Sequence, residues 1–145
     1  RPLVTTVRVA RAGQRAAMIP HIQALRDAGI IVSLFIDPDE AQIAASAQVG
    51  ATVIELHTGD YAEAATASLR ARELERLRRG AILGHDAGLS VAAGHGLDLR
   101  NVGAVAALAH VEELNIGHSI VARAVFIGFE AAVVEMRRAV AEAVR

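Results

Sequence analysis

The sequence predicts an α/β fold in which four parallel strands alternate with helices. Three observations support this prediction. Four short apolar runs rich in Val, Ile, Leu and Ala are separated by helical patterns, and the connections between them are short. The composition is 53% hydrophobic but only 3% aromatic, which suits a sheet covered by helices on both faces. Four such strands form either a small open sheet or half of an eight-stranded barrel.

Each expected strand is a short apolar segment that ends near glycine or a polar residue. The run GIIVSLFI is the clearest, because it is continuous and rich in β-branched residues, as buried parallel strands are. The expected strands cover residues 29–36, 51–59, 89–94 and 112–117. The expected helices cover residues 12–29, 38–50, 61–87, 101–110 and 119 to the end.

The helix after the first expected strand has clear boundary signals in the segment DPDEAQIAASAQVG. Asp37 is the expected N-cap, Pro38 the first helical residue and Glu40 the reciprocal carboxylate of a capping box. Gly50 is expected to end this helix. A carboxylate at Asp37 is therefore interpreted as a helix cap and not as a ligand.

The long helical segment at residues 61–87 is expected to bury one face. Gly80 could divide this segment into two helices, and Gly88 is expected to end it. The expected inward positions are all leucines: Leu69, Leu74, Leu77 and Leu83.

Composition and charge exclude several classes of protein. The formal net charge is −1 and no basic block is present, so nucleic acid is not an expected partner. There is no cysteine, which excludes disulfides and thiolate chemistry. No apolar run approaches the length of a membrane span, so we expect a cytoplasmic protein with no membrane partner. The first residue is Arg1, from which we expect the chain to be part of a longer protein.

Glu55 is the first candidate for chemistry, because parallel α/β sheets bind ligands at the carboxyl ends of their strands. It lies between Ile54 and Leu56 in VIELHTG. If these neighbours face the helices, Glu55 faces the opposite side of the sheet, together with His57. A buried carboxylate is costly unless it is paired. Glu55 is therefore either a partner in a structural ion pair or a carboxylate at a reacting centre.

His95 lies between Gly94 and Gly96 at the end of the next expected strand. Glycine on both sides lets the backbone approach a ligand closely and leaves N–H groups available to an anion. The alternative is a turn that carries an incidental imidazole.

A second Gly-His pair, Gly117 and His118, follows the last expected strand and opens a helix. The first N–H groups of a helix lack intrahelical partners and favour an anion, and the Ser119 hydroxyl could add a contact. Turns at the ends of neighbouring strands lie side by side. The two Gly-His pairs are therefore predicted to bind one phosphate between them.

Four segments are informative when they are taken together: VSLFIDPD, IELHTG, AGHGL and EELNIGHSIVARAVFIGFEAAVVEM. They resemble segments of pyridoxine 5′-phosphate synthases, a family of the deoxyxylulose-dependent route to vitamin B6. The resemblance implies a (β/α)8 TIM barrel of which residues 1–145 are one partial domain, the C-terminal half, with the N-terminal half absent. It also implies a homo-oligomeric, transferase-type synthase that condenses 3-amino-2-oxopropyl phosphate with 1-deoxy-D-xylulose 5-phosphate. The products are pyridoxine 5′-phosphate, phosphate and water.

The resemblance also implies roles for individual residues. His95 matches the family's proton donor, and Glu55 matches its transition-state-stabilising glutamate. No metal or other cofactor is implied, and the histidines lack a compact metal-ligand spacing. Thr5 matches a contact to the deoxyxylulose phosphate, and the contacts to the amino-ketone phosphate match Gly96, Gly117 and His118.

The sequence departs from the family pattern in two places. The loop after Thr6 is shorter and carries Arg8 and Arg11, and Ala92 stands where the family often has asparagine. Two other functions stay open. One is a different phosphate-binding barrel enzyme, although the chain contains no lysine for a Schiff base. The other is a non-catalytic half-barrel that binds a phosphorylated ligand or a partner.

Overall fold

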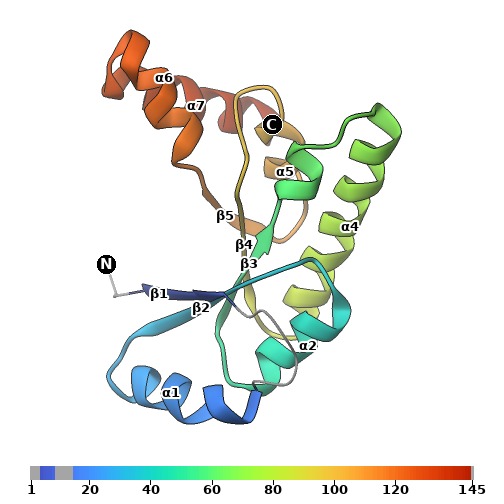
Figure 1. Cartoon of the computed structure of the whole chain (residues 1–145), viewed down its shortest axis with the longest axis vertical. Coiled ribbons are helices and arrows are strands. Elements are labelled where there is room, and N and C mark those ends of the chain that lie inside the picture. The colour runs from blue at the N-terminus through green and yellow to red at the C-terminus, as the bar shows by residue number, and fades with distance from the viewer. Residues whose placement is uncertain (1–3, 9–14, 145) are drawn as a thin grey trace.

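The computed structural model describes residues 4–8 and 15–144, and the side chains from residue 16 onward. Within these residues, five parallel strands form one sheet in the order β1-β2-β3-β4-β5 (Figure 1). Their bounds are β1 Val4–Arg8, β2 Ile31–Ile36, β3 Val53–His57, β4 Ser90–Gly94 and β5 Val111–Asn115. The four predicted strands are confirmed, and β1 is an additional strand that we did not predict.

The helices α1 to α5 connect successive strands, as parallel pairing requires, and α6 and α7 follow β5. The bounds of the helices are α1 Arg15–Asp27, α2 Glu40–Gln48, α3 Gly59–Ala62, α4 Ala67–Asp86, α5 Val102–Ala106, α6 His118–Ile127 and α7 Phe129–Ala143. The helical segment expected from residue 119 to the end is divided at Gly128, whose φ of +85° interrupts the helix. Residues 12–14 of the first expected helix, and most of the shortened loop expected after Thr6, lie outside the described residues.

The predicted cap of α2 is wrong by two residues. Asp39, not Asp37, is the N-cap, because its carboxylate accepts hydrogen bonds from two backbone N–H groups of the first turn. Pro38 therefore precedes the helix, and Glu40 is its first residue and not the distal partner of a capping box. The segment DPDE contains two aspartates that can cap, and the chain uses the second one.

The predicted break at Gly80 is also wrong, because α4 runs without interruption from Ala67 to Asp86. Gly80 is buried, and a Cβ at this position would lie 3.1 Å from the Cβ of Pro38. This glycine therefore allows α4 to pack closely against the segment before α2. Leu77 is buried as predicted, whereas Leu69 is exposed in the first turn of α4 and does not face the core.

The hydrophobic core lies between the sheet and the helices α1 to α5. Alternate residues of β2, β3 and β4 point into it, as the period of two in a strand requires. The core members from these strands are Val32, Leu34, Ile36, Ile54, Leu56, Val91 and Ala93, and the helices contribute Ile22, Ile43, Tyr61, Leu77, Ala81 and Val105. The other face of the sheet carries Phe35, Glu55 and His57, which are only half-buried.

The helices α6 and α7 lie together beyond the carboxyl end of β5 (Figure 1). They pack against each other, and α7 also contacts α5. All ten residues of α6 are described, and none of them is buried. Among the helices that the structure describes, none is long and apolar enough to cross a membrane.

Candidate active site

A cavity of about 780 Å³ opens at the carboxyl ends of β3, β4 and β5. Five of the six residues predicted to form the site line it: Glu55, His95, Gly96, Gly117 and His118. The remaining lining residues are Phe35, Ala62, Glu63, Leu97, Asp98, Arg100, Asn101, Asn115, Ile116 and Ser119. Thr5 belongs to β1, where it pairs with Val32 of β2, and its side chain lies outside the described part of the structure.

Glu55 points away from the core, as predicted from its position in β3. Its neighbours Ile54 and Leu56 are fully buried on the helix-covered face, whereas Glu55 is half-buried beside the cavity. The side-chain amide of Asn115 in β5 donates a hydrogen bond of 3.0 Å to the Glu55 Oε2 atom. The carboxylate is therefore held by the amide of Asn115, and no arginine whose side chain the structure describes pairs with it.

The pKa of Glu55 is raised above its ordinary value. Burial is the main cause, because it disfavours the charged carboxylate, and the negative charge of Glu113 adds to it. The hydrogen bond from Asn115 and the proximity of His95 oppose the rise. A carboxyl group with a raised pKa exchanges protons closer to neutral pH, which suits it to acid–base chemistry or to stabilising a nearby cation.

His95 has a backbone conformation that few residues adopt. Its φ is +89° and that of Gly96 is +76°, so the turn after β4 uses two successive left-handed residues. The hydroxyl of the buried Thr58 donates a hydrogen bond to the His95 carbonyl. The His95 ring is exposed toward the cavity and stacks on the His57 ring, with centroids 4.7 Å apart.

The loop that follows His95 is fixed by Asn101, which was not among the residues predicted from the sequence. The side-chain amide of Asn101 donates to the Gly96 carbonyl at 3.2 Å, and its Oδ1 accepts from the Asp98 N–H at 2.8 Å. The Tyr61 hydroxyl donates to the Asn101 carbonyl at 2.9 Å. The signal for this role was the Asp-Leu-Arg-Asn turn itself, since asparagine readily bonds to nearby backbone groups.

The second Gly-His pair lies beside the first one. Gly94 pairs with Asn115, so the turns that follow β4 and β5 are neighbours, and both line the cavity. Gly117 is exposed and precedes α6, whose first residue is His118. We expected the Ser119 hydroxyl to contact the anion, but it donates its proton to the Leu97 carbonyl at 2.7 Å and does not point that proton into the cavity. This bond ties the start of α6 to the loop after β4.

Within the described residues, no group of three or more His, Asp or Glu side chains lies close enough together to hold a metal ion.

Comparison with known proteins gives the family of the chain. Residues 4–142 match the family described as pyridoxal phosphate biosynthesis protein PdxJ. The chain belongs to the PdxJ family. A relative from Magnetococcus marinus, named pyridoxine 5′-phosphate synthase, is 53% identical over 133 residues, which is 92% of this chain and 55% of the relative. The chain therefore spans little more than half the length of the curated relative it matches.

Membership of the PdxJ family confirms the resemblance seen in the sequence. It also confirms the predicted fold class, since the parallel strands and alternating helices described above form part of the TIM barrel of this family. Within this PdxJ chain, the cavity lies at the carboxyl ends of the strands, where such barrels bind their ligands.

Proposed function

We propose that this chain contributes to a pyridoxine 5′-phosphate synthase. The reaction condenses 3-amino-2-oxopropyl phosphate with 1-deoxy-D-xylulose 5-phosphate and yields pyridoxine 5′-phosphate, phosphate and water. One observation carries the proposal: in a chain of the PdxJ family, Glu55, His95 and both Gly-His turns line a single cavity. The name of the relative from Magnetococcus marinus supports the same reaction.

His95 is the proposed proton donor. Ring closure requires several proton transfers, and an imidazole performs them near neutral pH. The His95 ring reaches the cavity from a turn that Thr58 holds through the His95 carbonyl. A proton donor on a fixed turn keeps its distance to the reacting atoms constant.

Glu55 is the proposed group that stabilises the transition state. Condensation of an amine with a ketone passes through a positively charged imine nitrogen. Burial raises the pKa of Glu55 because it disfavours the charged carboxylate. A cation that forms beside this carboxylate therefore stabilises it more than it would stabilise an exposed carboxylate. The amide of Asn115 holds this carboxylate at the cavity wall.

The phosphate groups are proposed to bind at the turns. Gly96, Gly117 and His118 are assigned to the amino-ketone phosphate, with main-chain N–H groups as the principal donors. A Cβ on Gly117 would meet no atom within 4 Å, so the space beside this residue is open to a ligand. Thr5 is assigned to the phosphate of deoxyxylulose phosphate on the basis of the family pattern.

The experiment is an exchange of segments between related proteins. The 133 matching residues of the Magnetococcus marinus protein are replaced by this chain, and the product is called the synthase chimera. Both substrates are added, and pyridoxine 5′-phosphate is measured by mass spectrometry. We expect product from the chimera and a loss of about 10² to 10⁴-fold when the chimera carries His95→Asn. A folded chimera that binds phosphate but forms no product would instead support a ligand-binding role.

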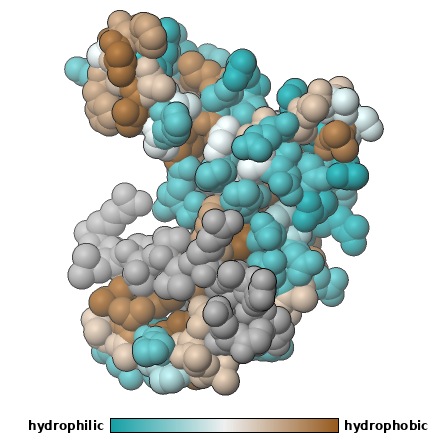
Figure 2. Space-filling view, in the orientation of Figure 1, coloured by the Kyte–Doolittle hydropathy of each residue, from teal (hydrophilic) through white to brown (hydrophobic). Residues whose placement is uncertain are grey.

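We also propose that the protein is a cytoplasmic homo-oligomer. Both substrates carry phosphates that do not cross a membrane unaided, so the enzyme belongs where they are made. Large apolar side chains gather on α6 and at the start of α7, among them Val125, Phe129 and Phe126, which is 83% exposed. Figure 2 shows hydrophobic atoms at this end of the molecule. Light scattering of the chain and of its Phe126→Ser variant tests whether this surface pairs.

A further inference from the structure

His57 lies next to the candidate site, although it is not one of the residues that line its cavity. Its ring stacks on His95, with centroids 4.7 Å apart and ring planes 28° from parallel. It also meets Phe35 edge-on, with centroids 5.2 Å apart. Both rings that it contacts do line the cavity. His57 therefore forms a layer directly behind the wall of the site.

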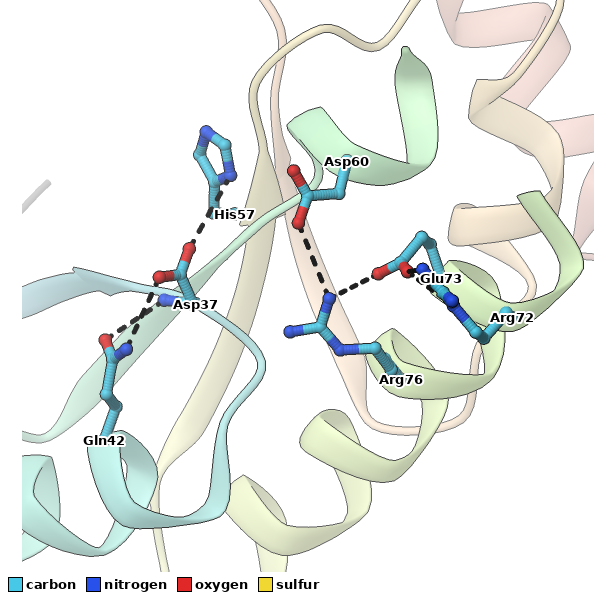
Figure 3. Close-up of polar contacts among 7 residues, drawn as sticks. All are labelled: Asp37, Gln42, His57, Asp60, Arg72, Glu73 and Arg76. Atoms are coloured by element: carbon cyan, nitrogen blue, oxygen red, sulfur yellow. Dashed lines mark hydrogen bonds and ion pairs between the residues drawn. The ribbon is translucent and has the colours of Figure 1, made fainter. Parts of the chain in front are cut away.

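The other sides of the His57 ring are also occupied. A Cβ on Gly59 would lie 2.5 Å from the His57 Cε1 atom, so the imidazole fits only because this position is glycine. The Asp37 Oδ1 atom lies 3.8 Å from His57 Nδ1, and the Gln42 amide donates to the other Asp37 oxygen at 3.4 Å (Figure 3). Asp37 is 58% exposed, so its attraction for a protonated His57 is screened. Packing therefore contributes more than charge to the orientation of His57.

His95 needs such support more than an ordinary residue does. It stands between two glycines and has a φ of +89°, and its ring is exposed to the cavity. Thr58 fixes the backbone of this turn, since its hydroxyl donates to the His95 carbonyl and its N–H donates to the Gly94 carbonyl at 2.9 Å. His57, the preceding residue, contacts the ring. Two consecutive residues thus hold the backbone and the side chain of His95.

We propose that His57 is a positioning residue that fixes the orientation of the His95 imidazole by stacking against it. The catalytic consequence rests on the proposed function, whereas the positioning itself does not. Because the stacking needs a flat ring and not a titrating group, we expect phenylalanine at this position to preserve the orientation of the His95 ring. We expect alanine to lose it.

The first test measures the order of the His95 side chain in this chain without any assay of activity. The ¹³C relaxation of the His95 ring is compared in the parent, His57→Ala and His57→Phe. We expect a rigid ring in the parent and in His57→Phe, and an order parameter below about 0.6 in His57→Ala. His85→Ala is the matched control, because His85 stacks on His110 with centroids 3.9 Å apart, away from the cavity. It should leave the order of His95 unchanged.

The second test measures turnover in the synthase chimera. His57→Ala should lower kcat by about tenfold or more, within the ~10²-fold that a 1 Å misplacement of a reacting group produces. KM should change little, because His57 does not line the cavity. His57→Phe should restore kcat to within about threefold of the parent, which a role in proton transfer would not allow.

A third variant keeps the proposal testable if His57→Ala does not fold. Gly59→Ala retains His57, but the added Cβ would lie 2.5 Å from His57 Cε1 and so displaces the ring. This variant should disorder the His95 ring as His57→Ala does. The proposal is overturned if the His95 ring stays rigid in a folded His57→Ala, or if His57→Phe is as disordered as His57→Ala. If the parent chimera forms no product, the proposed function fails, and the relaxation measurement still decides whether His57 positions His95.

Discussion

Gly94 ends β4 at the point where Glu55 of β3 and Asn115 of β5 approach each other, and replacing it tests how the site is held. A Cβ on Gly94 would lie 2.6 Å from Glu55 Oε1 and 2.8 Å from the Asn115 carbonyl oxygen. Ordinary van der Waals contact begins at 3.4 Å. In Gly94→Ala, the Glu55 carboxylate therefore has to retreat by about 0.8 Å, the difference between 3.4 and 2.6 Å.

A retreat of this size is large enough to break the 3.0 Å hydrogen bond from Asn115 to Glu55. The Asn115 carbonyl belongs to the backbone, so relief there requires β5 to move away from β4. Overpacking of this kind destabilises a protein by about 1–3 kcal/mol. For a chain of this length that corresponds to a fall in Tm of roughly 3–10 °C. Misplacement of Glu55 by nearly 1 Å should also lower kcat by about 10²-fold.

Thermal unfolding of the chain and turnover of the synthase chimera measure the two effects. The matched control is Gly103→Ala in α5, where the added Cβ would make an ordinary contact of 3.4 Å with Ala143. Alanine is favoured over glycine in a helix by about 0.5–1 kcal/mol, so the control should not lose stability. The reasoning is refuted if Gly94→Ala retains the Tm and the kcat of Gly103→Ala.

Three further predictions concern the other residues of the site. His95→Asn in the synthase chimera should lower kcat by about 10² to 10⁴-fold with a much smaller change in KM, and turnover within about threefold of the parent would remove its role as proton donor. Glu55→Gln should stabilise the chain increasingly as the pH rises above the ordinary pKa of a glutamate. The pKa of Glu55 is raised in the folded state, so the parent loses stability as the pH rises from the unfolded-state pKa through the folded-state pKa, and the variant does not. Tm measured for both proteins from about pH 4 to pH 7 checks the sign of this difference in stability. Gly117→Val should weaken binding of inorganic phosphate more than His118→Ala, because the expected contacts are to the main chain; amide NMR shifts outside the two Gly-His turns would contradict the shared anion site.

The four predicted strands were found because each is an apolar run with clear ends, a signal that depends on local sequence alone. β1 was missed because VTTVR contains two threonines and an arginine in five residues and lacks the continuous apolar character of the others. The cap of α2 was misplaced because two aspartates in DPDE satisfy the same local rule. Local chemistry could not choose between them.

The positions of the site residues could be predicted from the sequence, whereas the contacts that hold their side chains could not. The orientation of Glu55 followed from the period of two in a strand, and the neighbouring turns followed from parallel pairing. The contacts of Asn115 with Glu55 and of His57 with His95 join residues 60 and 38 positions apart along the chain. No local pattern specifies such contacts, because they depend on the register between strands and on side-chain packing. The need for glycine at position 59 could not be predicted from local sequence either, because it comes from the packing of the His57 ring against this residue.

The alternation along β3 has a consequence for how this enzyme family can diversify. Ile54 and Leu56 are fully buried in the hydrophobic interior, whereas Glu55 and His57 are half-buried on the opposite face of the sheet. A substitution at either of the latter two positions changes the side chains on that face and leaves the hydrophobic interior intact. The sequence can therefore change at one set of positions while the other set continues to specify the fold. Along β3, the positions that must stay apolar therefore alternate with positions that can change without disturbing the core.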